Sequence, residues 1–356
     1  MKNVFYILFL VVGFISCRKD QIISTAEITP YEIQYPEVIA ARIPPMEIPA
    51  DNPMTVQGVV LGKKLFYEKL LSADNTQACA TCHLSENSFT DPLKFSVGID
   101  DIEGTRNAMP IFNLGWAPSL FWDGRSKTLE EQALDPVTNP IEMHNTWEAA
   151  VAALQATTDY PLLFKAAFGT EIIDSLLVAK ALAQFERTLI SGNSPYDKYL
   201  RGEPTGYSPG DDFKMKAGYG IFIEESKGDC FHCHGDDFNV LFTDNMFHNN
   251  GLDVMPLDSG LAAITGDMSD MGQFKTPSIR NLIYTAPYMH DGRFETLEQV
   301  VEHYSAGLQP SPYIDPLMKN VDDGGVNLSS TEKEYLVFFL KSLSDESFIT
   351  NPDFQE

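Results

Sequence analysis

Two short segments of this sequence carry the same pattern of reactive side chains. Residues 79–83 read Cys-Ala-Thr-Cys-His, and residues 230–234 read Cys-Phe-His-Cys-His. Two thiols three positions apart can form thioether bonds with the two vinyl groups of one porphyrin, and the following histidine can ligate its iron. The pattern therefore predicts two covalently attached c-type haems. The attachment and ligand residues would be Cys79, Cys82, His83, Cys230, Cys233 and His234.

Two other kinds of site also use paired cysteines. Two such pairs can hold a structural zinc ion, and a single pair can be a thiol redox centre. Neither site needs a histidine directly after the second cysteine. With 7 histidines among 356 residues, chance would place one at a given position about once in fifty, and here it happens twice. We therefore favour haem attachment, and we interpret His232, inside the second motif, as a bystander.

The fifth cysteine, Cys17, follows a segment that is typical of export. Lys2 precedes an apolar run from Val4 to Ile15, which is shorter than the roughly 20 residues that a membrane-spanning helix needs. We predict that residues 1–16 are a signal sequence and that Cys17 is acylated, so that a lipid anchors the mature chain to a membrane. The alternative is an ordinary cleaved signal with an incidental cysteine.

The composition of the chain limits its organisation and its partners. About 340 residues follow the signal, which is enough for two domains of roughly 100 to 200 residues each. The chain has 50 acidic and 25 basic residues and a formal net charge of −25. Because few cations are available to neutralise phosphates, we expect no nucleic acid partner.

Hydrophobic periodicity predicts a mostly α-helical chain with long irregular loops. The clearest helical pattern runs over residues 174–190, where apolar side chains recur on one side. An apolar face also runs over residues 56–71. Further helices are predicted at 146–154, 213–223, 297–304 and 330–343. No convincing series of alternating strands is present.

The two cysteine motifs divide the chain into two cytochrome c-like domains, because each motif follows a helical pattern near the start of its half. The Gly- and Pro-rich segment 192–210 lies between the motifs and is the best boundary. We predict a lipid anchor and extended spacer over 17–52, a first haem domain over 53–205, a second haem domain over 206–345 and a tail over 346–356.

Five further segments match, in order, the motifs of one known family. They are Phe-Trp-Asp-Gly-Arg at 121–125, Leu-Glu-Glu-Gln-Ala at 129–133, Asn-Pro-Ile-Glu-Met at 139–143, Phe-Lys-Thr-Pro at 274–277 and Thr-Ala-Pro-Tyr-Met-His-Asp-Gly-Arg at 285–293. With the two haem motifs, this set resembles the bacterial di-haem cytochrome c peroxidase family, which also includes MauG. The resemblance covers roughly residues 52–343.

The resemblance implies roles for three side chains near the first haem. Glu142 and Gln132 would lie over the open face of the haem held by His83, where hydrogen peroxide binds, with Glu142 as the acid/base. Trp122 would lie between the two haems as an electron-transfer bridge. Splitting an O–O bond independently needs a group that moves a proton and a source of two electrons. The bland alternatives are a buried core aromatic for Trp122 and a surface carboxylate for Glu142.

The resemblance also implies one calcium ion at the domain interface. Asn107, Thr285 and Pro287 match the positions that hold it, the last two through their backbone carbonyls. Hard oxygen donors of this kind suit calcium.

The chain departs from typical peroxidases of the family at the first haem. In those members a second histidine ligates this iron in the resting state. No histidine lies between Leu84 and Trp122 here, and residues 96–101 read Ser-Val-Gly-Ile-Asp-Asp. We therefore expect a five-coordinate or water-bound haem that needs no reductive activation. His144 lies too near Glu142 in the sequence to substitute, and we interpret it as structural or surface.

A second departure concerns the distal ligand of the second haem, which is methionine in typical members. The corresponding position here is Tyr304, and MauG-like members also carry tyrosine there. A phenolate stabilises ferric and higher states, whereas a thioether raises the reduction potential. His303 competes for this role, but consecutive helix residues point about 100° apart, so only one can face the iron. Met289 and Met271 are further options.

These features predict an exported enzyme that reduces hydrogen peroxide to water at the first haem, with electrons passed through the second. The expected donor is a small periplasmic cytochrome c or cupredoxin, and the expected location is the periplasm, with Cys17 lipid-anchored to a membrane. One alternative is a MauG-like enzyme that uses peroxide to oxidise side chains of a partner protein. A non-catalytic di-haem electron carrier is a second alternative. The oligomeric state is left open, with a homodimer as one option.

Overall fold

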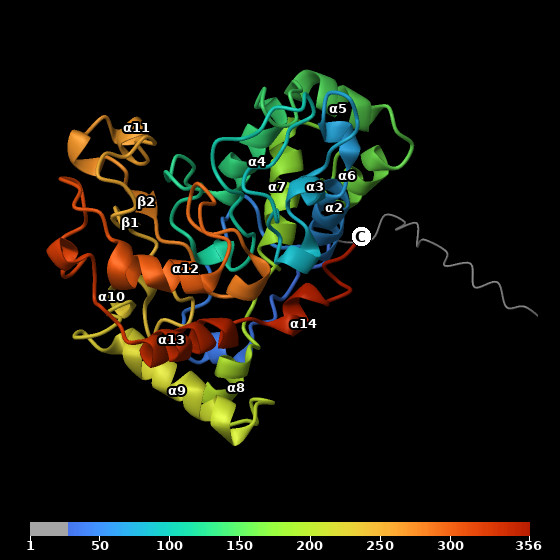
Figure 1. Ribbon diagram of the computed structural model, residues 1–356. Coiled ribbons are helices and arrows are strands. Elements are labelled where there is room, and N and C mark those ends of the chain that lie inside the picture. Colours follow the sequence, from blue (N-terminus) through green and yellow to red (C-terminus); the bar gives the residue numbers. More distant parts are fainter. Residues whose placement is uncertain (1–27) are drawn as a thin grey trace, which may run out of the picture.

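The computed structural model describes residues 28–356, so the predicted signal sequence and Cys17 lie outside the described residues. The described chain is mostly helical, with long irregular connections, as the periodicity predicts (Figure 1). Two short strands pair antiparallel, with Phe247 opposite Lys275. Within residues 28–356, no helix has the length and apolar character that crossing a membrane requires.

The helices and strands follow in this order. The first half contains α1 (Glu37–Ala40), α2 (Val56–Phe66), α3 (Cys79–Cys82), α4 (Leu129–Thr138), α5 (Trp147–Gln155), α6 (Tyr160–Phe168) and α7 (Ser175–Glu186). The second half contains α8 (Pro195–Leu200), α9 (Pro209–Ile223), α10 (Phe231–His234), β1 (Phe247–His248), α11 (Ala262–Thr265), β2 (Phe274–Lys275), α12 (Leu297–Glu302), α13 (Ser330–Ser342) and α14 (Glu346–Ile349). Single 3₁₀ turns lie at Lys69–Leu71, Ser85–Asn87, Leu114–Trp116, Met268–Asp270, Leu282–Tyr284 and Val321–Asp323, and a π turn at His303–Gly307. The helices predicted from the hydrophobic pattern are α2, α5, α7, α9, α12 and α13.

A first hydrophobic core lies among α2, α4, α6 and α7. The side chain of Asp174 caps α7 by accepting a backbone N–H of its first turn, and Leu182 and Phe185 are buried on its inner side. α2 lies very close to α7 because Gly62 has no side chain. A Cβ at Gly62 would lie 1.9 Å from the carbonyl oxygen of Ala181. The first cysteine motif packs on this core.

A second hydrophobic core forms around α9 and α13. Ser208 caps α9, and Ser329 forms a capping box with Glu332 at the start of α13. The two helices approach closely at Gly218, where a Cβ would lie 2.0 Å from the carbonyl oxygen of Tyr335. The second cysteine motif packs on this core, so each motif has a core of its own.

Residues 28–52 do not form the separate spacer that the sequence predicts. Val38 and Ile39 of α1 are fully buried in the second core. The indole Nε1 of Trp116 also donates a hydrogen bond to the carbonyl oxygen of Pro44, at 2.8 Å. Apolar residues gain from burial whether or not they follow a helical period, and this explains why a segment without periodicity is held against the fold.

The predicted tail also belongs to a core, and it is the core of the other half. α14 buries Phe348, whose ring centroid lies 5.7 Å from that of Phe89 and 6.0 Å from that of Phe112. The hydroxyl of Tyr67 donates to the carbonyl oxygen of Phe354 at 2.7 Å, which places the C-terminus beside α2 (Figure 1). The start of the described chain therefore packs on the second core, and its end packs on the first core.

The change from the first core to the second occurs earlier than the predicted boundary after residue 205. Tyr196, in α8, is fully buried in the second core. Its neighbour Asp197 forms a fully buried ion pair with Arg280, with 2.8 Å between a carboxylate oxygen and a guanidinium nitrogen. The boundary between the cores therefore lies between α7 and α8.

Candidate functional site

The first cysteine motif forms α3 and its C-cap. Cys79 and Cys82 are three positions apart and lie one above the other on one face of the helix. His83 follows at the C-cap, with its Nδ1 2.8 Å from the carbonyl oxygen of Phe89. With Nδ1–H as the donor, Nε2 keeps its lone pair for a metal. Burial lowers the pKa of His83, which favours the neutral, ligating imidazole.

The second motif forms α10, with Cys230 as its N-cap. Nδ1 of His234 is buried and makes no hydrogen bond to the described residues. Burial lowers the pKa of His234 to about 4, although the nearby carbonyls of Phe242 and Pro277 oppose this shift. This imidazole is therefore also neutral.

Both motifs fit c-type haems better than the alternatives. None of the four cysteines within residues 28–356 forms a disulfide. Burial raises the pKa of Cys79 and of Cys230 to about 12, so neither is the activated thiolate of a redox centre. A four-cysteine zinc site would need both pairs around one ion, but each pair packs on a different core.

Glu142 lies in the turn that follows α4, beside the first motif. Its carboxylate Oε1 accepts a hydrogen bond of 2.6 Å from the amide of Asn139. Burial, and then the charge of Asp135, raises the pKa of Glu142. The N–H of Ala73 donates to the carbonyl oxygen of Met143 at 3.0 Å, and the amide of Gln77 donates to the carbonyl oxygen of Val97 at 2.9 Å, so the turn of Glu142 adjoins the segment that leads into the first motif. This is the geometry of an acid/base group beside a cofactor site.

Residues 96–101, where typical members of the family supply a second histidine, run alongside Glu142. The backbone N–H of Ile99 donates to the carbonyl oxygen of Glu142 at 3.0 Å. His144 does not turn towards the motif. It is more than half exposed, and its Nδ1 lies 2.5 Å from a carboxylate oxygen of Asp100.

Gln132 lies on α4, whose first turn is capped by the side chain of Thr128. Its neighbour Ala133 is buried in the first core, which fixes the orientation of the helix. The amide side chain of Gln132 is partly buried and makes no hydrogen bond to residues 28–356. It is therefore available to a ligand.

Trp122 is buried where the two halves meet. Its Nε1 donates to the carbonyl oxygen of Asn107 at 2.8 Å, and its ring lies edge-on to Phe274 and His290, with centroids 6.5 Å away in each case. The rings of Phe274 and His290 stack with centroids 3.6 Å apart. The N–H of Lys275 donates to the carbonyl oxygen of Trp122 at 2.8 Å. The indole thus contacts residues of the second half directly.

The three residues predicted to hold calcium lie on adjoining segments. The N–H of Asn107 donates to the carbonyl oxygen of His290 at 2.8 Å, and its side-chain amide donates to the carbonyl oxygen of Leu93 at 3.1 Å. Thr285 is buried, and the peptide bond before Pro287 is cis. The Asn107 segment therefore meets the segment that carries the other two residues.

Tyr304 lies in the π turn that follows α12. Its hydroxyl accepts a hydrogen bond of 2.9 Å from the amide of Asn250, and the same amide lies 3.5 Å from the sulfur of Met289. Burial raises the pKa of Tyr304 to about 12, and the thiols of the second motif add to the shift, so the phenol lies near them. His303 is engaged elsewhere, because its Nε2 lies 3.1 Å from the carbonyl oxygen of Asn250.

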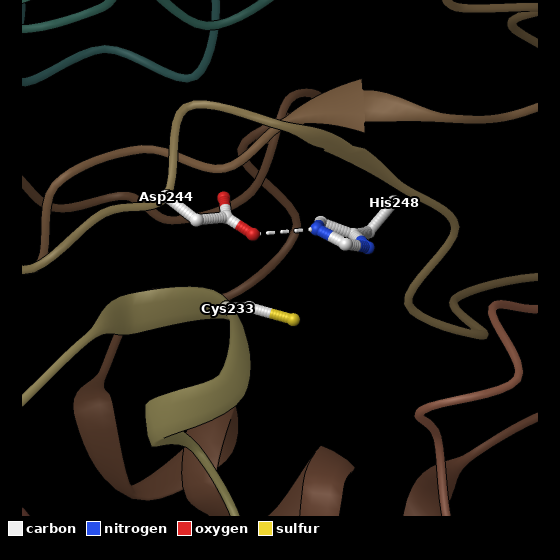
Figure 2. A group of neighbouring side chains, drawn as sticks. All are labelled: Cys233, Asp244 and His248. Carbon is white, nitrogen blue, oxygen red and sulfur yellow. Dashed lines mark hydrogen bonds and ion pairs between the residues drawn. The ribbon is translucent and has the colours of Figure 1, made fainter.

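Cys233, Asp244 and His248 form a compact group beside the second motif (Figure 2). His248 lies between two carboxylates, with Nε2 2.9 Å from Asp244 and Nδ1 2.6 Å from Asp315. The hydrogen bonds with Asp244 and Asp315 raise the pKa of His248, which favours the protonated imidazole. A protonated imidazole has no lone pair for a metal. We therefore interpret the group as an ion-paired brace that holds the loop over Cys233.

Comparison with known proteins decides the family. A family model described as di-haem cytochrome c peroxidase matches residues 56–205. Methylamine utilization protein MauG of Methylorubrum extorquens is 37% identical over 300 residues, which cover 84% of this chain and 81% of that protein. The chain belongs to the di-haem cytochrome c peroxidase family. Membership implies two c-type haems, in agreement with the two motifs.

Other relatives of this chain represent both branches of the family. Cytochrome c551 peroxidase of Nitrosomonas europaea is 34% identical over 267 residues, which cover 74% of this chain and 78% of that protein. A solved structure of a MauG-like protein associated with microbial copper homeostasis is 35% identical, with a TM-score of 0.81, and covers 91% of this chain and 98% of that chain. Family membership alone does not select a branch.

Three groups near the motifs were not predicted from the sequence. Asn250 orients the phenol of Tyr304, and His248 braces the second motif. Glu186 is buried with one carboxylate oxygen unbonded, its pKa is raised by burial to about 8, and it contributes to the raised pKa of Cys79. Glu186 approaches Cys79 from a distant part of the chain, and His248 and Asn250 follow the second motif at no recognisable spacing, so the sequence carries no signal for these positions.

Proposed function

We propose that this chain reduces hydrogen peroxide to water at the site of His83, with electrons entering through the site of His234. The observation that carries the proposal is the half-buried carboxylate of Glu142, in a turn that adjoins the segment leading into the first motif. The neighbouring segment 96–101 supplies no histidine. The site therefore offers a proton-transferring group where peroxide would bind.

The overall reaction consumes one peroxide, two protons and two electrons and yields two waters. When bound, the haem supplies the redox-active iron at which peroxide is reduced. Glu142 takes a proton from one peroxide oxygen and delivers it to the other, which leaves as water. Asn139 holds one carboxylate oxygen of Glu142 at 2.6 Å, which leaves the other oxygen for this proton transfer. The free amide of Gln132 would hydrogen-bond the peroxide.

Trp122 is proposed as the electron route between the two sites. It contacts Phe274 and His290 of the second half and is held by a hydrogen bond to Asn107. We also propose that a calcium ion at Asn107, Thr285 and Pro287 stiffens this junction, because oxygen donors suit calcium and the Asn107 segment adjoins the segment of the other two residues.

The proposal includes export and a membrane anchor. Cleavage before Cys17 and acylation of its thiol would tether the enzyme in the periplasm. A small cytochrome c or cupredoxin is proposed as the donor, and a homodimer as the assembly to test by sedimentation.

The test is to mix the fully oxidised holoprotein with stoichiometric peroxide and follow the absorption spectrum. We expect a rapid change at the first haem and, with reduced cytochrome c present, two donor molecules oxidised for each peroxide. A protein that stays silent in both its oxidised and its half-reduced state would be an electron carrier, and the proposal would fail.

A MauG-like activity is the second candidate, favoured by Tyr304. The phenol lies near the thiols of the second motif, and tyrosine there matches the MauG-like pattern. In this case the two electrons come from side chains of a partner protein. Because the solved MauG-like relative is associated with microbial copper homeostasis, copper proteins are the first partners to test. Peroxide consumption that needs such a protein, and not a redox donor, would select this branch.

A further inference from the structure

Lys275 is a buried cation without a carboxylate partner in the described chain. Its side chain is 3% exposed, and its Nζ donates a single hydrogen bond of 2.8 Å, to the carbonyl oxygen of Ser119. Other buried cations are paired: Arg280 with Asp197, and Arg187 with Glu130. No ion pair within residues 28–356 includes Lys275, so the polypeptide leaves its charge uncompensated.

The ammonium form of Lys275 needs a counter-charge. Burial lowers its pKa to about 8, and no carboxylate opposes this shift. The amine therefore still carries a proton at neutral pH. A buried charge is strongly unfavourable unless it is paired, and the nearby acids are already engaged. Asp123 binds Arg106, and Asp244 binds His248.

The position of Lys275 points to the second haem. Its N–H donates to the carbonyl oxygen of Trp122 at 2.8 Å. Pro277, two residues further on, places its carbonyl beside the imidazole of His234. Two residues span at most about 7 Å. Lys275 thus lies between the indole and the residues that would hold the second haem.

We propose that Lys275 is a carboxylate-binding residue whose ammonium group pairs with a propionate of the haem attached to Cys230 and Cys233. A haem brings two carboxylates into a site that otherwise has an unpaired ammonium group. A charge-assisted hydrogen bond between them satisfies both. The inference rests on the two-haem cofactor set and not on reactivity with peroxide.

The test measures the reduction potentials of both haems in the holoprotein, without peroxide. A cation beside a propionate favours the reduced iron, so Lys275→Met should lower the potential of the second haem. We expect its reduction equilibrium constant to fall at least tenfold, which corresponds to 59 mV for one electron. Lys180→Met is the matched control, because Lys180 already pairs with Asp51 and lies on α7. Both potentials should stay unchanged in that variant.

Two further variants keep the test decisive. If the Lys275→Met variant loses haem, Lys275→Gln is used in its place, because it removes the charge and keeps a polar side chain. Lys275→Arg should retain most of the wild-type potential. Infrared difference spectra with ¹³C-labelled propionates should show a carboxylate band that moves in Lys275→Met. Unchanged potentials and bands with full haem content would overturn the proposal, and so would a shift confined to the first haem. A protein that ignores peroxide but shows these shifts would refute the peroxidase proposal alone.

Discussion

Glu142 shows how the surroundings of one residue change its proton affinity. Burial raises its pKa, the charge of Asp135 adds to the rise, and the amide of Asn139 keeps one oxygen in place. A carboxylate with an ordinary pKa would be a weak base at neutral pH. A raised pKa brings proton affinity closer to the operating pH, where proton transfer is most effective.

Glu142→Gln tests this role. Because the amide cannot accept the peroxide proton, the rate of reaction with peroxide should fall about 10²-fold or more. In the wild type, the rate should rise with pH through a carboxyl pKa above the ordinary range, and this dependence should disappear in the variant. Stopped-flow absorption gives both results. Glu131→Gln, on an exposed position of α4, is the control. Equal rates in all three proteins would exclude Glu142 as the acid/base.

Tyr304→Met tests the ligand of the second haem. Replacement of a phenolate by a thioether should raise the reduction potential of this haem, because the phenolate stabilises the ferric state. Spectroelectrochemistry measures the change. Met289→Leu is the control, since its sulfur shares the amide of Asn250 with the phenol. A spectrum altered by Met289→Leu and unaffected by Tyr304→Met would assign the ligand to Met289.

At the scale of elements, α9 offers a matched pair of glycines. Gly218 faces α13, where a Cβ would lie 2.0 Å from the carbonyl oxygen of Tyr335, whereas Gly220 has no atom within 4 Å of that position. Gly218→Ala should therefore lower the free energy of unfolding by about 1–3 kcal/mol. Gly220→Ala should raise it by roughly 0.5–1 kcal/mol, because alanine favours the helix. Urea denaturation measures both values, and equal effects would contradict the close helix contact.

The π turn at His303–Gly307 separates the two side chains that are candidate ligands of the second haem. Sequence position alone leaves His303 and Tyr304 as neighbours at the end of α12. The widened turn directs His303 to the carbonyl of Asn250 and Tyr304 to the amide of the same residue. Such turns recur at functional sites, and here one places the phenol on the side of the second motif.

At the scale of the whole molecule, each end of the described chain packs on the core of the opposite half. Phe348, near the C-terminus, packs on Phe89, whose carbonyl oxygen lies 2.8 Å from Nδ1 of His83. Val38 and Ile39, near the start of the described chain, pack into the second core. Each haem motif therefore depends on the end of the chain that is farther from it in the sequence.

Phe348→Ala tests this dependence. Removing the buried ring should lower the free energy of unfolding by about 3–5 kcal/mol. It should also disturb the spectrum of the first haem more than that of the second, because Phe89 positions His83. Denaturation and absorption spectra give these two results. Phe213→Ala is the control, since Phe213 is 61% exposed. A spectral change confined to the second haem would contradict the packing described.

The buried pair of Asp197 and Arg280 predicts a dependence of stability on pH. Burial by itself raises the pKa of Asp197. The opposite effect of Arg280 and of the hydrogen bonds from Ser194 is larger, so the pKa lies below its ordinary value. The pair therefore stabilises the fold above the unfolded-state pKa of about 4, and this stabilisation is lost as the pH falls through the lowered folded pKa.

Arg280→Met should cost about 3–5 kcal/mol at neutral pH, because it leaves a buried carboxylate without a partner. The deficit should shrink as the pH falls, since the carboxyl then takes up a proton. Urea denaturation at several pH values measures this trend. Lys165→Met, which breaks an exposed pair with Glu171, should cost under about 1 kcal/mol. A deficit that does not vary with pH would show that packing, and not charge, is lost.

Much of the structure can be predicted from residues that lie close together in the sequence. The two haem motifs depend on a spacing of three residues, and the six confirmed helices depend on a period of 3.6, so both are visible along the chain. The family also follows from ordered motifs. The buried N-terminal segment and the tail packed on the first core were not predictable, because burial without periodicity leaves no pattern along the sequence.

The sequence by itself determined the cofactor class, the helical class and the family, since each is carried by residues close together in the chain. The tertiary structure alone decided which side chains surround each motif: Glu142 beside one, Tyr304, Lys275 and the ion-paired His248 beside the other. These groups are brought together by folding over separations of many residues. Their pKa values depend on burial and on charges that only the packed chain places nearby.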